Sequence, residues 1–173
     1  MANNKNISPE NALNRLAALC SRSEQAESDL RSKLRSWGIA DADADAIIDR
    51  LYNLRFLDRE RYTRAFVRDK FRFEGWGKIK ITFQLRQKGF DACLIEDALT
   101  EIADEEYSER LTQLLVTKAR SLHGKEYLQA KASLVRFAAS RGFEPALIYK
   151  IIPKVLTQHP DCDADCHDSY LDD

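Results

Sequence analysis

The sequence predicts an all-α protein made of three tandem three-helix repeats, each resembling a helix-turn-helix arrangement, in an extended, curved array. Three observations lead to this prediction. The 173 residues include only six glycines and four prolines, too few for the many turns of a strand-rich fold. A pattern of apolar residues recurs three times around a glycine, at spacings of 51 and 53 residues. Within each copy, the apolar residues have the spacing of one helix face.

The repeat is aligned on Gly38, Gly89 and Gly142, and seven flanking positions are apolar in all three copies. In order along the repeat, these positions hold Leu30, Ile81 and Leu134; Leu34, Leu85 and Ala138; Ile39, Phe90 and Phe143; Ala44, Ile95 and Ile148; Ile47, Ala98 and Ile151; Ile48, Leu99 and Ile152; and Leu51, Ile102 and Val155. Each copy is therefore expected to contain a helix that ends at the glycine, a turn, and a second helix.

The second helix of each pair is expected to open at a carboxylate, which suits the exposed amides of a helix start. These carboxylates are Asp41, Asp91 and Glu144, and Pro145 fits a first helical turn. An upstream amphipathic helix completes each repeat. The first such helix begins near Ser8, with Pro9 in its first turn; the second begins at Asp58; the third contains Leu111, Leu114, Leu115, Ala119 and Leu122.

The predicted boundaries are a flexible N-terminus at residues 1–7, repeats at 8–55, 56–104 and 105–157, and an acidic, flexible tail at 158–173. The alternative is a single irregular helical bundle.

No apolar run approaches the ~20 residues of a membrane span, and the first residues lack the apolar core of a signal peptide. We therefore expect a cytoplasmic protein with no membrane association and with reduced cysteines. Cys20 and Cys93 stand among apolar residues and are predicted to be small core side chains.

Charge is unevenly distributed along the chain. Residues 160–173 contain six aspartates and no Lys or Arg, so a net charge of −1 for the whole chain leaves +5 for residues 1–159. Residues 59–88 hold ten Lys or Arg against three Asp or Glu. Such a basic centre predicts a polyanion or an acidic protein surface as partner.

On the helix that begins at Asp58, aromatic and basic side chains are expected to lie on different faces. The core face is predicted to carry Tyr62, Ala65, Phe66 and Phe73. Trp76, between two glycines, is the ring that we expect to be exposed.

The candidate binding residues form the basic centre. They are Arg61, Arg64, Arg68, Lys70, Arg72, Trp76, Lys78, Lys80, Arg86 and Lys88. Their cations could neutralise DNA phosphates or engage acidic protein. The helices after the repeat glycines begin with acidic or apolar residues, which argues against recognition of a specific operator sequence.

Catalytic signatures are absent from the sequence: "GWGKIK" is not a nucleotide loop, and no hydrolase or zinc-protease motif occurs. The carboxylates Glu101, Asp104, Glu105 and Glu106 are typical of a solvated helix face. We expect no enzyme activity and no cofactor. Weak zinc candidates in the tail are His159, Cys162, Cys166 and His167, although their spacing fits no usual finger and incidental thiols are the favoured interpretation.

Several stretches resemble the RecX family, bacterial regulators of the recombinase RecA. The stretches are "FLDRERYTRAFVRDK", "GWGKIKITFQLRQKGF" and "IEDAL" in the centre, with "RSEQAESDLRSKLRSWGI" and "IIDRLYNLRFLD" upstream. The resemblance covers roughly Leu13 to Val155 and implies three tandem three-helix repeats.

The resemblance also implies a non-enzymatic protein that binds the RecA–DNA filament along its groove. Such proteins usually inhibit ATP hydrolysis, strand exchange and coprotease action, and also bind single- and double-stranded DNA weakly; we expect a monomer. The matching residues are Arg61, Tyr62, Phe66, Trp76, Gly77, Lys78 and Lys88. Lys80 stands where the family usually has arginine, and the Cys- and Asp-rich tail is outside the family pattern.

Three other functions stay open from the sequence. One is a helix-turn-helix regulator that acts on DNA directly. The second is a zinc-dependent protein that uses the tail, and the third is a helical adaptor for an unrelated protein.

Overall fold

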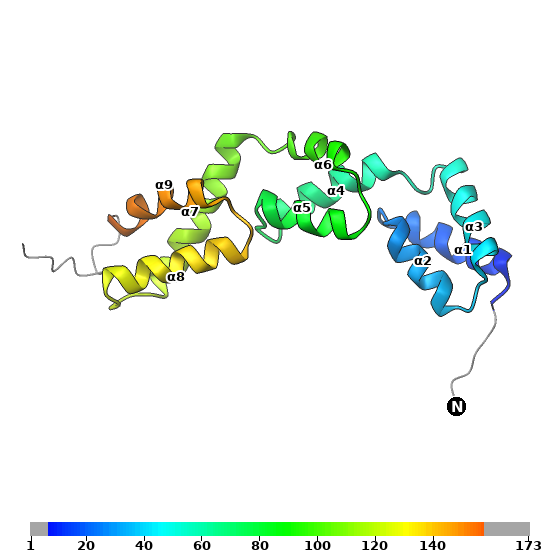
Figure 1. Cartoon of the computed structure of the whole chain (residues 1–173), viewed down its shortest axis with the longest axis horizontal. Helices are drawn as coiled ribbons and strands as arrows, with labels where there is room; N and C mark the ends of the chain where they lie inside the picture. The colour runs from blue at the N-terminus through cyan, green and yellow to red at the C-terminus, as the bar shows by residue number, and fades with distance from the viewer. Residues whose placement is uncertain (1–6, 158–173) are drawn as a thin grey trace, which may run out of the picture. The chain divides into compact units, whose positions relative to one another are not determined.

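The computed structural model describes residues 7–157, which form nine helices and no strand (Figure 1). The helices are α1 (Pro9–Cys20), α2 (Glu27–Ser36), α3 (Asp41–Asn53), α4 (Arg59–Arg72), α5 (Lys78–Gln87), α6 (Ala92–Leu99), α7 (Asp104–Arg120), α8 (Tyr127–Ser140) and α9 (Pro145–Thr157). The predicted all-α class is confirmed, with three helices in each predicted repeat. None of these nine helices is long and apolar enough to cross a membrane.

By its internal contacts the chain divides into two compact units. The first unit comprises Met1–Asp69 and Thr82–Glu101, and the second comprises Lys70–Ile81 and Ile102–Asp173. The second repeat therefore contributes to both units, because α4 and α5 each cross from one unit to the other.

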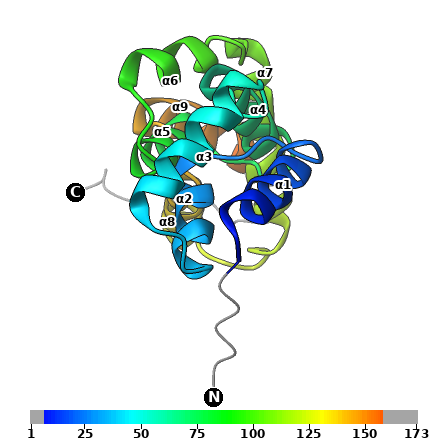
Figure 2. The same cartoon turned by 90° about the vertical axis from the view of Figure 1, so that its right-hand side faces the viewer.

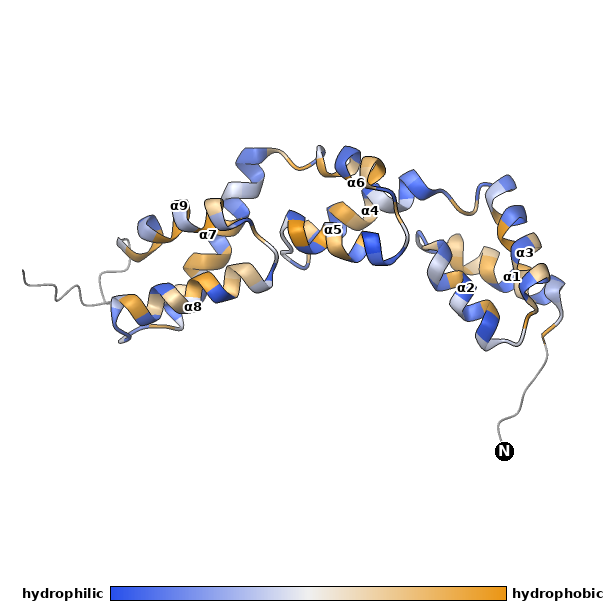
Figure 3. Ribbon diagram, in the orientation of Figure 1, coloured by the Kyte–Doolittle hydropathy of each residue, from blue (hydrophilic) through white to orange (hydrophobic). Residues whose placement is uncertain are grey.

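In the first unit, α1 and α2 pack against α3, and the three helices lie side by side in two perpendicular views (Figures 1 and 2). Their core is aliphatic, and Leu16, Leu30, Leu34 and Leu51 are fully buried in it. In the second unit, α7, α8 and α9 pack on one another in the same way. Figure 3 shows that the helices carry both apolar and polar positions, as amphipathic helices do.

The repeat pattern found in the sequence is a burial pattern. Of the 21 residues at the seven aligned positions, all are buried except Leu99, which is half-buried. The periodicity therefore reports the core-facing side of each helix pair, which is the physical reason that it recurs.

The three repeat glycines end their helices in the left-handed conformation, with φ of 76° at Gly38, 84° at Gly89 and 85° at Gly142. In each copy, the amide of the residue after the glycine donates to the carbonyl of the residue four positions before the glycine. In the first copy, Ile39 N donates to Leu34 O at 3.1 Å. This is the bond of a Schellman cap, and its two residues are both buried apolar positions of the repeat. The predicted glycine turns are confirmed.

Helix starts follow the sequence with one difference. Pro9 and Pro145 are the first residues of α1 and α9, and the Asp58 carboxylate accepts from the Arg61 amide at 2.9 Å. Asp91 precedes α6 but makes no side-chain cap, because its carboxylate instead accepts from Arg59 at 3.1 Å.

Two predictions of burial or exposure near the middle of the chain were wrong. Phe73 is 80% exposed because α4 ends at Arg72, so no helix face directs the ring inward; Val67 and Phe71 fill the core instead. Trp76 is half-buried and less exposed than Phe73, contrary to the prediction.

Cys20 is buried as predicted, but Cys93 is exposed. The reason is its place on α6. The buried residues of this helix are Ile95 and Ala98, and a residue two positions before Ile95 points to the opposite side.

Candidate anion-binding surface

The ten candidate binding residues divide equally between the two units. The first unit holds Arg61, Arg64, Arg68, Arg86 and Lys88, and the second holds Lys70, Arg72, Trp76, Lys78 and Lys80. Each group is described separately below.

In the first unit, Arg64 is surrounded by carboxylates. Its guanidinium contacts Glu101 at 2.5 Å, Asp97 at 2.7 Å and Glu60 at 2.9 Å, which joins α4 to α6 and the turn that follows it. Hydrogen bonds to Glu101 and Glu60 raise the pKa of Arg64 above its usual range. The charge that the sequence suggested for binding is therefore already compensated within the fold.

Arg61 and Lys88 have similar internal roles. Arg61 Nε donates to Glu24 at 2.5 Å, and that hydrogen bond raises the arginine's pKa. Lys88 Nζ lies 2.7 Å from the Asp29 carboxylate on α2. Both cations thus connect segments of the second repeat to segments of the first.

Two cations of this unit are more available. Arg68 is 52% exposed and lies 3.8 Å from the neighbouring Asp69, a weak contact for an ion pair. Arg86 is exposed and forms no ion pair with any described residue.

In the second unit, Lys78 and Arg72 meet the acidic first turn of α7. Lys78 Nζ lies 3.3 Å from Asp104, and Arg72 Nε lies 3.5 Å from Glu106. Glu101, Asp104 and Glu106, expected to be a solvated face, are thus partners of the basic centre. Of the nine candidate cations, only Lys80 and Arg86 have no carboxylate partner among the described residues.

Tyr107 connects three elements of the second unit. Its buried hydroxyl accepts from the Lys78 amide at 2.9 Å and donates to Glu144 at 2.7 Å. Burial, together with the hydrogen bond to Glu144, raises the pKa of Tyr107 well above its usual range. The phenol therefore remains a proton donor at the junction of α5, α7 and α9.

The "GWG" stretch is a docking turn, by which we mean a turn that packs against another turn. Gly77 N donates to Arg141 O at 2.8 Å, and Ile79 N donates to Gly142 O at 3.1 Å. A Cβ on Gly77 would overlap the backbone of Gly142 and Phe143. The second-repeat turn thus lies directly against the glycine turn of the third repeat.

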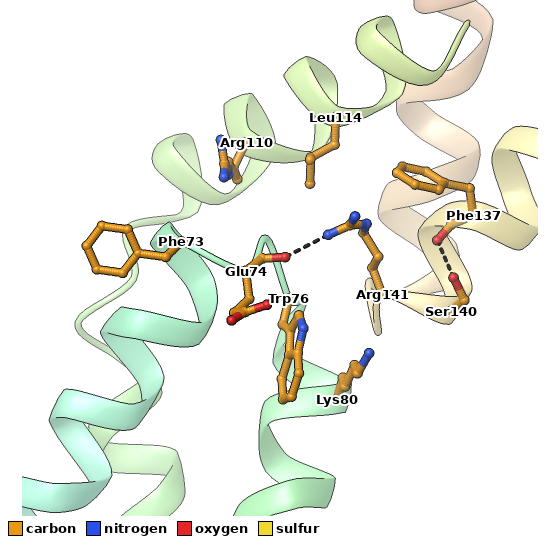
Figure 4. Close-up of a pocket in the computed structure, with 9 residues that line it drawn as sticks. All are labelled: Phe73, Glu74, Trp76, Lys80, Arg110, Leu114, Phe137, Ser140 and Arg141. Carbon is orange, nitrogen blue, oxygen red and sulfur yellow. Dashed lines mark hydrogen bonds between the residues drawn. The ribbon is translucent and has the colours of Figure 1, made fainter. Parts of the chain in front are cut away.

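A cleft of about 570 Å³ opens beside this docking turn in the second unit (Figure 4). It is lined by Phe73, Glu74, Trp76, Lys80, Arg110, Leu114, Phe137, Ser140 and Arg141, and we call it the cationic cleft. The ammonium groups of Lys70 and Lys80 lie 4.9 Å and 4.4 Å from the centre of the Trp76 ring. Cation–π attraction orients these charges beside the cleft.

Two arginines of the cleft are held in place by backbone carbonyls. Arg141 Nη1 donates to Glu74 O at 2.6 Å, and Arg110 Nη2 donates to Arg72 O at 2.9 Å. The Arg110 Nε atom is buried and has no hydrogen-bond partner within residues 7–157. These arginines and Lys80 form no ion pair with a described residue, and Glu74, the one carboxylate among the lining residues, lies 3.7 Å from Lys70.

Sequence reasoning missed Arg110 and Arg141, because both belong to the third repeat, far along the chain from the basic centre. One signal was available. Arg141 precedes the repeat glycine, where the second copy has Lys88. The tail's zinc candidates lie outside the described residues, and the described residues contain no cluster of three potential metal ligands.

Three-helix repeats, each with a left-handed glycine after its middle helix, define an all-helical repeat protein. Three family models match in order: the first three-helix domain of RecX at residues 12–51, the second at 58–99 and the third at 104–152. The chain belongs to the RecX family of regulatory proteins.

Individual relatives agree with this assignment. The protein named Regulatory protein RecX in Prosthecochloris aestuarii is 28% identical over 146 residues, covering 84% of this chain and 94% of its own length. Its namesake in Clostridium botulinum is 31% identical over 137 residues, covering 78% of this chain and 64% of its own length.

Solved structures share the fold. The crystal structure of RecX from Lactobacillus salivarius has a TM-score of 0.73 at 22% identity, covering 90% of this chain and 98% of that one. A second crystal structure, of a regulatory protein RecX, has a TM-score of 0.75 at 23% identity, covering 84% of this chain and 71% of that one.

Proposed function

We propose that this protein binds the filament that RecA forms on DNA and lowers RecA's ATP hydrolysis, strand exchange and coprotease activity. The observation that carries the proposal is the order of the three RecX domains, which together match most of residues 12–152. The protein acts in the cytoplasm as a monomer, by binding alone, with weak contacts to single- and double-stranded DNA.

Repeated helical units suit a filament as partner, because a filament presents the same surface many times. Several weak contacts, made together, bind far more tightly than any one of them. Binding inhibits RecA only if the protein prefers one filament state, since a ligand shifts an equilibrium through its differential affinity.

Three cations of the basic centre support contact with phosphates or with acidic protein. Arg68, Arg86 and Lys80 are the candidate residues least occupied by internal carboxylates. They are therefore the residues through which charge contributes to filament binding in this proposal.

A helix-turn-helix regulator that reads DNA directly is less well supported. The first turn of α3 carries Asp41 and Asp43, and the first turn of α6 contains no basic residue. A recognition helix places its N-terminal residues among phosphates and base edges, where carboxylates are repelled.

The test is to titrate this protein into RecA from the same organism and follow ATP hydrolysis that depends on single-stranded DNA. We expect the rate to fall at well below one molecule per RecA monomer, because one molecule then affects many subunits. An unchanged rate, with binding to bare DNA intact, would instead support the DNA-binding regulator.

Charge reversals locate the contact. The variant Arg68→Glu/Lys80→Glu/Arg86→Glu should weaken inhibition at least tenfold. The matched control, Lys33→Glu/Arg136→Glu/Lys150→Glu, makes the same change in net charge at exposed cations outside the basic centre. Equal losses in both variants would mean that net charge, not this surface, decides binding.

A further inference from the structure

We propose that the cationic cleft is a binding site for an acidic peptide segment, and that its occupant is the chain's own residues 160–173. This proposal does not depend on RecA as partner. It assigns a role to the tail, which the family resemblance leaves without one.

The first argument is charge. Lys80, Arg110 and Arg141 line the cleft without a carboxylate partner among the described residues, while Glu74, its single carboxylate, lies 3.7 Å from Lys70. Residues 160–173 carry six aspartates and no cation other than a histidine. Carboxylates accept hydrogen bonds from a fixed guanidinium with favourable geometry and charge.

The second argument is preorganisation. Carbonyl oxygens already hold the Arg110 and Arg141 guanidiniums, so little side-chain entropy is lost when an anion binds.

The third argument is the apolar part of the cleft. Phe73, Leu114 and Phe137 line it beside the cations, and Phe73 is 80% exposed. In Figure 4, the Phe73 ring points outward at the edge of the cleft, so Leu114 and Phe137 supply the apolar surface near Arg141, which lies 5.0 Å from the centre of the Phe137 ring. Tyr170 and Leu171 give the acidic segment apolar side chains that match this lining.

The segment after α9 is long enough to reach the cationic cleft. Arg141 stands four residues before Pro145, the first residue of α9, so the cleft lies near the start of that helix. The 13 residues of α9 rise roughly 20 Å. The 16 residues that follow Thr157 span up to about 50 Å when extended, so they can return along α9 and still cover the cleft.

Docking of the segment would regulate access to the cleft. Because the segment is tethered, its effective concentration is on the order of millimolar. A competing polyanion can bind only those molecules whose cleft the segment does not occupy. Its apparent affinity is therefore its intrinsic affinity multiplied by the fraction of such molecules. If nine molecules in ten are docked, the apparent affinity falls about tenfold.

The chain supplies its own probes for a test in the full-length protein. A nitroxide label is attached to Cys162 in a Cys93→Ser/Cys166→Ser variant. The one remaining cysteine, Cys20, is protected from labelling because it is buried and because burial raises its pKa. The nuclear magnetic resonance signals of the two indole N–H groups then report the label's position. We expect the label to broaden the Trp76 signal to less than half its intensity and to leave the Trp37 signal unchanged.

Matched variants decide the result. Lys80→Glu should restore the Trp76 signal, and Lys150→Glu, at an exposed position of α9 outside the cleft, should not. Absent broadening, equal broadening of both indoles, or broadening that survives Lys80→Glu would each overturn the proposal.

A competition experiment separates the tail from nucleic acid as occupant. Changing the six tail aspartates to asparagine should raise the affinity for a thymidine oligonucleotide about tenfold. In the Lys80→Glu protein, the same six changes should have little effect. A gain of equal size in both proteins would mean that net charge alone acts, and that the segment does not occupy the cleft.

Discussion

At the residue scale, Gly77 shows how a single side chain can be excluded by tertiary structure. Its φ is not in the left-handed region, so glycine is not required by the local backbone. It is required because the backbone of Gly142 occupies the place where a Cβ would be. The requirement therefore comes from a segment 65 residues further along the chain.

Gly77→Ala should lower the free energy of unfolding of the second unit by about 1–3 kcal/mol, because backbone must move to admit the methyl group. Urea unfolding, with hydrogen exchange of the amides in α7 to α9, measures the loss. Gly89→Ala is the control, since its Cβ would meet open space and only the positive φ costs stability, roughly 1–2 kcal/mol. If hydrogen exchange in α7 to α9 were as slow in Gly77→Ala as in Gly89→Ala, the close approach would be unimportant.

Glu27 is a residue whose protonation matters for the first unit. Burial raises its pKa, but hydrogen bonds from Arg31 at 2.7 Å and Tyr52 at 2.8 Å, with the charge of Arg31, lower it below the usual 4.5. Burial and the bond to Glu27 raise the pKa of Tyr52 to about 12, so its hydroxyl stays a donor. The folded state therefore binds the proton of Glu27 less readily than the unfolded state.

Because the pKa of Glu27 is lower in the folded than in the unfolded state, its carboxylate stabilises the protein at pH values above the unfolded pKa. This stabilisation is lost as the pH falls through the folded pKa. Glu27→Gln should cost about 1–2 kcal/mol at pH 7 and much less at pH 3. Urea unfolding at both pH values tests this, with Asp49→Asn on the exposed side of α3 as control. A cost independent of pH would contradict the ionic role of Glu27.

At the element scale, the faces of α4 have different structural roles. Tyr62, Val67 and Phe71 are buried, and the Tyr62 ring stacks on Phe90 with centroids 5.2 Å apart. Arg64, on another face, joins α4 to α6 through carboxylates. The helix is thus held on two sides, by packing and by charge, and only part of its arginine stripe is available for binding.

Reversal of Arg64 should expose this structural role. Arg64→Glu places a fourth carboxylate among Glu60, Asp97 and Glu101, so repulsion replaces attraction. We expect a larger fall in melting temperature than for Arg68→Glu, with part of the loss recovered at 0.5 M salt because salt screens exposed charges. Equal melting temperatures for the two variants would assign Arg64 to binding instead.

At the scale of the whole molecule, internal ion pairs limit how many cations of the proposed binding surface lack a carboxylate partner. Nine of the ten candidate residues are cations, and seven of these pair with carboxylates. At the basic centre or the cleft, Lys80, Arg86, Arg110 and Arg141 have no carboxylate partner in the part of the chain that the structure describes. The molecule therefore presents fewer free charges than residues 59–88 suggest.

The salt dependence of binding to single-stranded DNA measures this number. Each neutralised phosphate contributes about −0.7 to the slope of log K against log salt concentration. These four cations predict a slope of roughly −3, whereas all nine candidate cations of residues 61–88 would give roughly −6. Fluorescence anisotropy with a labelled oligonucleotide at several salt concentrations distinguishes the two. A slope near −6 would mean that DNA displaces the internal carboxylates.

The sequence by itself determined the helical class, the three repeats and most of the core. Helix periodicity and the Schellman glycines are local, so 20 of the 21 aligned residues could be identified as buried without knowing what they contact. Phe73 was misplaced because apolar spacing leaves the end of a helix uncertain by a few residues, and α4 ends at Arg72. Cys93 was misplaced because it lies on the face of α6 opposite the buried Ile95.

Only the tertiary structure decided which charges are free. Arg64 meets Asp97 and Glu101 more than 30 residues away, and Arg141 comes beside Trp76 from another repeat. Whether a cation is neutralised depends on carboxylates within about 4 Å, and chain folding sets those distances regardless of separation in sequence. Composition could therefore locate the basic centre, but the cationic cleft required the fold.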